Sequence, residues 1–149
     1  MKTTIGMDLG DKHNQVCILN EQGDVTKTVR IGNTRTAIEK FFKPYSGCLV
    51  AIETGTHSPW ISRLLKELGC EVLVGNARRL RAIWDTDYKT DVRDAEMLAR
   101  LARFDRKLLH PVEHRNEQAQ IDLEIIKTRD ALKKGRIDLI TMYAVWSNR

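Results

Sequence analysis

Hydrophobic positions in the first part of the chain follow a strand-like period in five places. Apolar residues either alternate with polar ones or form short continuous runs, at 3–10, 15–20, 25–32, 48–53 and 71–75. Both patterns are typical of β-strands. Short turns join the first three segments, and "EQGD" at 21–24 is typical of a hairpin. The sequence therefore predicts three antiparallel strands in a row, followed by two buried strands.

Segments with a helical period stand before, between and after the last two strands. Helix-like spacing occurs at 34–44, 58–69, 76–84 and from Asp91 to about Arg103. Thr34 is a candidate N-cap and Pro44 a stop signal. In the next helix we expect Ser58 at the N-cap, Pro59 at the first helical position and Gly69 at the end.

Three antiparallel strands followed by alternating helices and strands predict an α/β fold with a mixed sheet and helices on both faces. The same order of elements occurs in the ribonuclease-H fold. In a sheet of that topology the first and fourth strands are neighbours. We assign residues 1–110 to this domain.

The remaining residues, 111–149, change character. From 116 onward the sequence has no proline and reads as one long helix. Four of its apolar residues are spaced seven apart, at Ile125, Leu132, Leu139 and Trp146. Ile126 and Ile140 lie beside this row. This spacing predicts a coiled-coil-like helix that pairs with another helix, and it favours a homo-oligomer. Packing back onto the globular domain is the alternative.

Composition and charge limit the functional classes. The chain has 149 residues, of which 42% are hydrophobic and 30% charged, with a net charge of +5 that permits a nucleic-acid partner without requiring one. No apolar run approaches the ~18 residues of a membrane span, and no signal peptide is evident. Three widely spaced cysteines without a CxxC motif indicate neither disulfides nor a zinc knuckle. We therefore expect a cytoplasmic protein with no membrane partner.

Four carboxylates stand at the ends of predicted elements. Asp8 and Glu53 end the first and fourth strands, each followed by a glycine two positions on, and Asp91 and Asp94 open the helix that runs to about Arg103. Taken singly, the strand-end acids are solvated, and the aspartates suit a helix N-terminus as caps. Taken together, they converge if the first and fourth strands are neighbours. Converged carboxylates are suited to holding divalent cations for phosphodiester chemistry.

Basic residues surround this predicted site and are interleaved with Trp84 and Tyr88. Lysine and arginine neutralise phosphates, and aromatic rings stack on unpaired bases. The candidate nucleic-acid contacts are Lys12, Arg78, Arg79, Arg81, Lys89 and Arg93. A solvated basic face is the alternative. His57, four positions after Glu53, is open to two interpretations, a contact with substrate or a structural role in a turn.

Three stretches of the sequence resemble one family. They are "GMDLGDKHNQVCIL", "AIETGTHSPWISRLLKELGCEVLVGNARRLRA" and "KTDVRDAEMLARL". They resemble the N-terminal DEDD domain of IS110-type transposases, a group that includes the pilin-gene invertases, and the resemblance runs from about residue 3 to about residue 145. It implies a RuvC-like version of the ribonuclease-H fold. It also implies that Asp8, Glu53, Asp91 and Asp94 form the catalytic, metal-binding tetrad.

The resemblance further implies a DNA transposase or site-specific recombinase that uses Mg²⁺ or Mn²⁺. The resemblance therefore implies DNA as a partner. Some family members are guided by a structured RNA, and for such members RNA is a partner as well. Family members continue into a second domain with a serine implicated in strand exchange. The sequence to Arg149 lacks that domain, so we do not expect complete recombination from it alone.

Two other functions are compatible with parts of the sequence. The first is a non-catalytic module that binds nucleic acid or oligomerises through 116–149. The second is a nucleotide-binding fragment of an actin-like or sugar-kinase fold, which also begins with a strand ending in "DLG". The segment "DLGDKHNQ" lacks the glycines of a phosphate-binding turn. Divalent-metal binding separates the transposase from the first alternative, and ATP binding tests the second.

Overall fold

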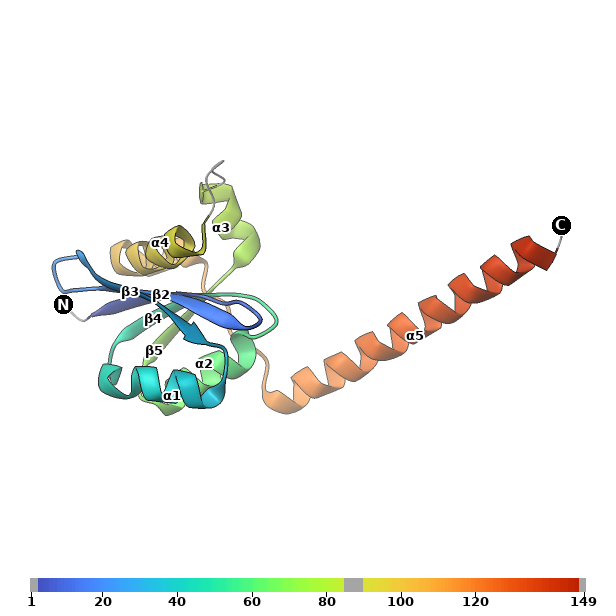
Figure 1. Ribbon diagram of the computed structural model, residues 1–149, viewed down its shortest axis with the longest axis horizontal. Helices are drawn as coiled ribbons and strands as arrows, with labels where there is room; N and C mark the ends of the chain where they lie inside the picture. Colours follow the sequence, from blue (N-terminus) through green and yellow to red (C-terminus); the bar gives the residue numbers. More distant parts are fainter. Residues whose placement is uncertain (1–2, 85–89, 148–149) are drawn as a thin grey trace. The chain divides into compact units, whose positions relative to one another are not determined.

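Five strands form one mixed sheet in the order β3-β2-β1-β4-β5 (Figure 1). In the computed structural model, which describes residues 3–84 and 90–147, the strands are β1 (Thr4–Asp8), β2 (His13–Leu19), β3 (Val25–Gly32), β4 (Leu49–Glu53) and β5 (Glu71–Gly75). The first three pair antiparallel, while β1 with β4 and β4 with β5 pair in parallel. The predicted fold class is confirmed, and β1 and β4 are neighbours.

The chain divides into two compact units, Met1–Glu113 and His114–Arg149. The helices of the first unit are α1 (Arg35–Phe42), α2 (Ser58–Glu67), α3 (Ala77–Trp84) and α4 (Asp91–Phe104), with short 3-10 turns at Lys43–Tyr45 and Arg106–Leu109. The second unit contains the 31-residue helix α5 (Glu117–Ser147). The roles assigned to 1–110 and 111–149 stay predictions.

Strand alternation gives the sheet two apolar faces. On one face, side chains such as Ile5, Met7, Val50 and Ile52 pack with residues of α1 and α2. On the other face, Leu49 and Ala51 pack with Leu80 of α3 and Leu98 of α4. Figure 1 shows α1 and α2 on one side of the sheet and α4 on the other.

The predicted helix starts were partly right. Thr34 caps α1, since its hydroxyl oxygen accepts a hydrogen bond from the Ala37 amide at 3.3 Å. The prediction that Ser58 caps α2 was wrong, because the N-cap is His57. The Ser58 side chain is buried and bonds back to Gly55, donating to its carbonyl at 2.8 Å and lying 3.0 Å from its amide nitrogen. Ser58 therefore stabilises the turn before the helix.

No helix among residues 3–84 and 90–147 combines the length and apolar character needed to cross a bilayer.

Candidate active site

Asp8 and Glu53 are the last residues of two neighbouring parallel strands. The pairing of β1 with β4 runs from Thr4 opposite Leu49 to Met7 opposite Ile52, so the two acids come next on their strands. Side chains alternate between sheet faces. Because Met7 and Ile52 pack on the α1 and α2 side, Asp8 and Glu53 belong to the face that α4 covers. Both acids are half-buried.

The direction of α4 brings its N-terminus to the same end of the sheet. Ala102, near the C-terminus of α4, packs with Leu49 at the start of β4. Arg103, one residue later, donates a 3.2 Å hydrogen bond to the carbonyl oxygen of Asn20, after the end of β2. The helix therefore runs opposite to β1 and β4. Its first turn, which contains Asp91 and Asp94, lies toward the strand ends that carry Asp8 and Glu53.

A threonine, and not an aspartate, caps α4. The Thr90 hydroxyl oxygen accepts a hydrogen bond from the Arg93 amide at 3.3 Å, and its carbonyl oxygen accepts one from the Asp94 amide at 3.0 Å. The interpretation of Asp91 as the cap was wrong, since Asp91 is the first helical residue and exposed. Asp94 is half-buried. Because Thr90 supplies the cap, neither carboxylate is needed for it.

The donor chemistry of these four residues fits a hard divalent cation. All four offer carboxylate oxygens, which are the ligands that Mg²⁺ and Mn²⁺ prefer, and three of them are half-buried at one end of the sheet. Within the described ranges, no three His, Cys, Asp or Glu side chains are already arranged to hold a metal ion. Metal binding by Asp8, Glu53, Asp91 and Asp94 therefore stays a prediction.

The predicted basic residues that the structure describes lie at the same sheet end. Lys12 follows β1, Arg78 and Arg79 lie in the first turn of α3 directly after β5, and Arg93 lies in the first turn of α4; all four are exposed. The side chains of Arg81, Trp84, Tyr88 and Lys89 lie outside the described residues. A contact between any of these basic residues and nucleic acid stays a prediction.

Thr54 joins the end of β4 to the start of α3. Its amide donates to the Gly75 carbonyl at 2.9 Å, and its hydroxyl oxygen accepts from the Ala77 amide at 3.0 Å. Asn76 accepts from the Arg78 amide through its side-chain oxygen at 3.1 Å. These bonds hold the Arg78 segment beside the strand that ends at Glu53.

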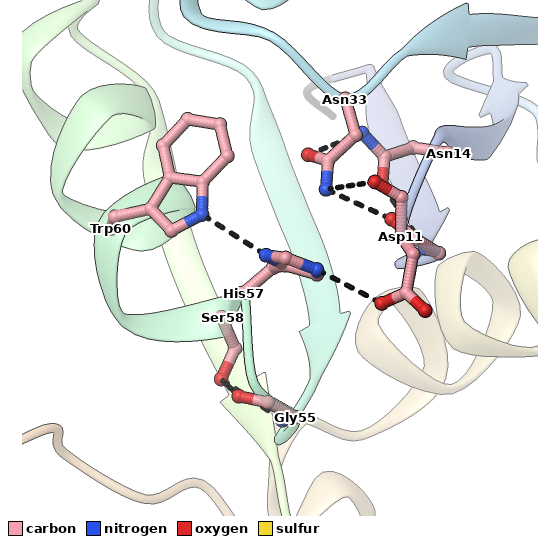
Figure 2. A network of polar contacts seen from close by, with 8 residues as sticks. Asp11, Asn14, Asn33, Gly55, His57, Ser58 and Trp60 are labelled. Carbon is pink, nitrogen blue, oxygen red and sulfur yellow. Dashed lines mark hydrogen bonds and ion pairs between the residues drawn. The ribbon is translucent and has the colours of Figure 1, made fainter. Parts of the chain in front are cut away.

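A polar network orders the loop that follows Asp8 (Figure 2). Asn14, which is fully buried, accepts from the Gly10 amide at 3.2 Å and donates to the Asn33 side-chain oxygen at 3.2 Å. Asn33 in turn donates to the Gly10 carbonyl at 2.9 Å. No local sequence pattern marks these asparagines, because their partners lie up to 23 positions away.

His57 connects this loop to the start of α2. Its Nε2 atom lies 3.1 Å from Asp11 Oδ1, and its Nδ1 atom accepts a 3.4 Å hydrogen bond from Trp60 Nε1 (Figure 2). Since the indole can only donate, Nδ1 is the acceptor and Nε2 carries the proton that faces Asp11. The ring thus links the loop after Asp8 to the loop after Glu53, which supports the structural interpretation of His57.

Solved structures share this fold. The chain resembles a structure titled "T. thermophilus RuvC in complex with Holliday junction substrate", with a TM-score of 0.51 and 11% identity over 71% of this chain and 98% of that chain. It also resembles "Thermus thermophilus RuvC structure", with a TM-score of 0.51 and 11% identity over 74% of this chain and 99% of that one. At this identity the likeness establishes the RuvC-like, ribonuclease-H-like fold alone.

Comparison of sequences establishes the family. No curated protein matches the chain significantly. The family model of the DEDD transposase of IS110 elements, described as "Transposase", matches residues 5–142. This range contains all four predicted acidic residues and most of α5. The chain therefore belongs to the IS110-type DEDD transposase family.

Proposed function

We propose that this transposase-family domain carries out divalent-metal-dependent phosphodiester chemistry on DNA, with Mg²⁺ or Mn²⁺ held by Asp8, Glu53, Asp91 and Asp94. One observation carries the proposal. Two neighbouring parallel strands each end in an acidic residue, and α4, which covers the same face of the sheet, has two further acidic residues in its first turn. The fold neighbour RuvC was solved with a Holliday junction, which supports branched DNA as the substrate class.

The bound cations would neutralise charge on the oxygens of the phosphodiester that gain it during the reaction. The four carboxylates would hold these cations and fix their position relative to the rigid sheet. Without cations, the same carboxylates repel one another and repel a phosphate. DNA binding in a productive position is therefore expected to depend on metal.

Exposed basic residues at the same sheet end would bind the phosphates that flank the reacting one. Lys12 follows β1, Arg78 and Arg79 begin α3, and Arg93 lies one residue before Asp94. Arg81 and Lys89 complete the proposed set. Each phosphate contact releases condensed counterions, so the affinity for DNA should fall as salt rises. Arg79→Ala should weaken binding and reduce the slope of that dependence.

Substitution of Asp8 tests the chemistry. Asp8→Asn removes one ligand charge at nearly constant size, so we expect loss of metal-dependent cleavage of a branched DNA and at least tenfold weaker Mn²⁺ binding by calorimetry. Binding of the DNA should persist or strengthen, because one charge that repels phosphate is gone. Asp24→Asn is the matched control, because Asp24 is exposed in the turn at the opposite end of the sheet.

Cleavage by Asp8→Asn at the wild-type rate would overturn the proposal. Nucleic-acid binding by the wild type without metal binding or cleavage would favour the non-catalytic module instead. ATP binding would be the signature of the nucleotide-binding alternative.

We further propose that α5 pairs with α5 of a second copy. Many large apolar side chains of α5 are exposed, including Ile125, Leu132, Leu139 and Trp146. Exposed apolar residues that repeat every seven positions are typical of helices that associate. Pairing of two copies would place two candidate active sites in one assembly, which suits a branched DNA with two strands to process.

Guidance by a structured RNA is part of the proposal only through the family resemblance. A labelled structured RNA, competed by branched DNA in a gel-shift assay, would test it, and equal competition by any polyanion would argue against guidance. Location in the cytoplasm is likewise proposed, and fractionation of expressing cells would test it.

A further inference from the structure

A groove lies between the edge strand β3 and helix α1, on the sheet face opposite α4. It has a volume of about 450 Å³, which is within the usual range of ligand sites. Its lining combines two lysines and two aromatic rings with small or rigid residues, including Lys27, Gly32, Lys40, Phe41, Pro44 and Tyr45. None of the described residues that line it carries a carboxylate, so the groove is suited to an anionic ligand with a flat apolar part.

The two rings form a supported platform. The Phe41 and Tyr45 rings lie 5.5 Å apart between centroids, at 31° to one another. Both are half-buried and pack against the core below α1, and Phe41 also meets the Phe42 ring edge-on at 5.1 Å. Because the core holds one side of the pair, its other side can stack on a planar ligand without losing side-chain freedom.

A lysine covers part of this platform. The Lys27 ammonium lies 5.8 Å from the centroid of the Phe41 ring. An exposed cation–π contact of this kind is worth about 0.5–1 kcal/mol, whereas a base stacked on an aromatic ring is worth about 1–3 kcal/mol. A base can therefore displace the ammonium from the ring. Lys27 and the exposed Lys40 would then be available to a phosphate.

We propose that this groove binds an unpaired nucleotide of a nucleic-acid strand, with its base on Phe41 and Tyr45 and its phosphates at Lys27 and Lys40. The strand would approach from the candidate active site. Since β3 runs in the direction of β1, the Gly32 end of the groove lies at the sheet end where β1 finishes at Asp8. The inference rests on the proposed function only for the class of polymer, and DNA and RNA share the recognising chemistry.

The test measures binding of labelled ten-nucleotide DNA and RNA single strands, and of a duplex, by fluorescence anisotropy at several salt concentrations. We expect K27Q/K40Q to weaken single-strand binding about tenfold at low salt. The slope of log affinity against log salt should fall by about 1.4, which is about 0.7 for each of two lost phosphate contacts. K66Q/K107Q removes the same charge at exposed lysines elsewhere and should leave the slope unchanged.

Stacking is tested separately with 2-aminopurine in the strand, because its fluorescence falls when it stacks. Phe41→Leu keeps apolar volume under the groove but removes the ring. It should reduce the quenching and weaken binding about fivefold to tenfold at an unchanged salt slope. Tyr45→Leu should do the same, and it replaces Phe41→Leu if that variant loses its folded circular dichroism.

Equal effects of the two double-lysine variants, or unchanged quenching in the ring variants, would overturn the inference. Tighter binding of DNA than RNA, or the reverse, identifies the polymer. A wild type that cleaves branched DNA with metal but does not bind single strands in the groove would contradict this inference alone. A wild type that binds single strands in the groove but shows no metal-dependent cleavage would contradict the proposed function alone.

Discussion

Gly6 on β1 lies directly beneath the backbone of Ala95 on α4. A Cβ atom at Gly6 would be 1.9 Å from the Ala95 carbonyl oxygen and 2.6 Å from the Ala99 amide nitrogen. No side chain fits at such distances, so the glycine allows α4 to rest on the sheet. Ala95 directly follows Asp94, and Gly6 stands two residues before Asp8. This contact therefore determines how closely the acids of α4 approach those of the strands.

Gly6→Ala should separate α4 from β1. The overpacking should cost at least about 1–3 kcal/mol of the free energy of unfolding, measured by urea denaturation, and should weaken Mn²⁺ binding more than the stability loss explains. Gly55→Ala is the control, because a Cβ there meets nothing within 4 Å. Equal stability of both variants would show that the helix can shift without cost.

Removal of the His57 ring should loosen the two loops that follow Asp8 and Glu53. Because the Asp11 side chain is 95% exposed and the His57 side chain 29% exposed, the pair should add less than about 1 kcal/mol to stability. We therefore expect His57→Ala to keep nearly the wild-type urea midpoint. Amide exchange should become faster at residues 9–12 and 54–57, and the apparent metal affinity should fall.

His57→Gln separates the two contacts of the ring. The glutamine amide can still donate to Asp11, but it has no acceptor in place of the ring Nδ1 that faces Trp60. The variant should therefore keep much of the metal affinity that His57→Ala loses. Trp60→Phe removes the indole donor alone. It should therefore cause the part of the loss in metal affinity that depends on the bond between Trp60 and His57. If all three variants bind metal like the wild type, His57 has no positioning role.

Leu132→Asp should disrupt the proposed pairing of α5. Leu132 is 70% exposed, so a charge there costs little in a lone helix but is buried and unpaired in a helix pair. Sedimentation should give a smaller assembly, while the urea midpoint of the sheet domain stays constant. Thr128→Asp, one turn earlier at an exposed polar position, is a milder comparison. A wild type that is monomeric at all concentrations would contradict the pairing.

Alkaline pH should destabilise the domain through its buried thiols. Burial raises the pKa of the Cys70 thiol to about 11, with a smaller contribution from Cys48. Burial, followed by the charge of Glu96, raises the pKa of Cys17. The unfolded thiols lose their protons first, near pH 8.5. Stability is therefore fully present below that pH and decreases as the pH rises toward the folded pKa values.

Urea midpoints between pH 7 and pH 10.5 would measure this loss. Cys70→Ala should make the decline shallower, although the variant starts from a lower stability because it leaves a small gap in the core. In the folded wild type at pH 8, iodoacetamide should modify the half-buried Cys48 before the buried Cys17 and Cys70. An identical pH dependence in wild type and Cys70→Ala would assign the effect to other groups.

Local pattern was sufficient for the elements and their order. The alternation at 25–32 predicted β3 with its observed bounds, and Thr34 marked the start of α1. These signals are local, since they arise from side chains a few positions apart that share one face or one turn. The family motifs then identified Asp8, Glu53, Asp91 and Asp94 as the candidate tetrad, and this role stays a prediction.

Tertiary structure decided what depends on residues far apart in the sequence. Thr90 rather than Asp91 caps α4, because turn geometry decides which neighbouring polar residue stands at the helix start. At the start of α2, His57 occupies the N-cap position in place of Ser58 and makes no capping side-chain hydrogen bond. Gly6 and Ala95 are almost ninety positions apart, and their contact is a close approach of two backbones. No local sequence pattern predicts such a contact. The sequence by itself determined which side chains could act at the site. The packing of α4 on β1 determined that they stand at one end and one face of the sheet, because only the folded chain brings these segments together.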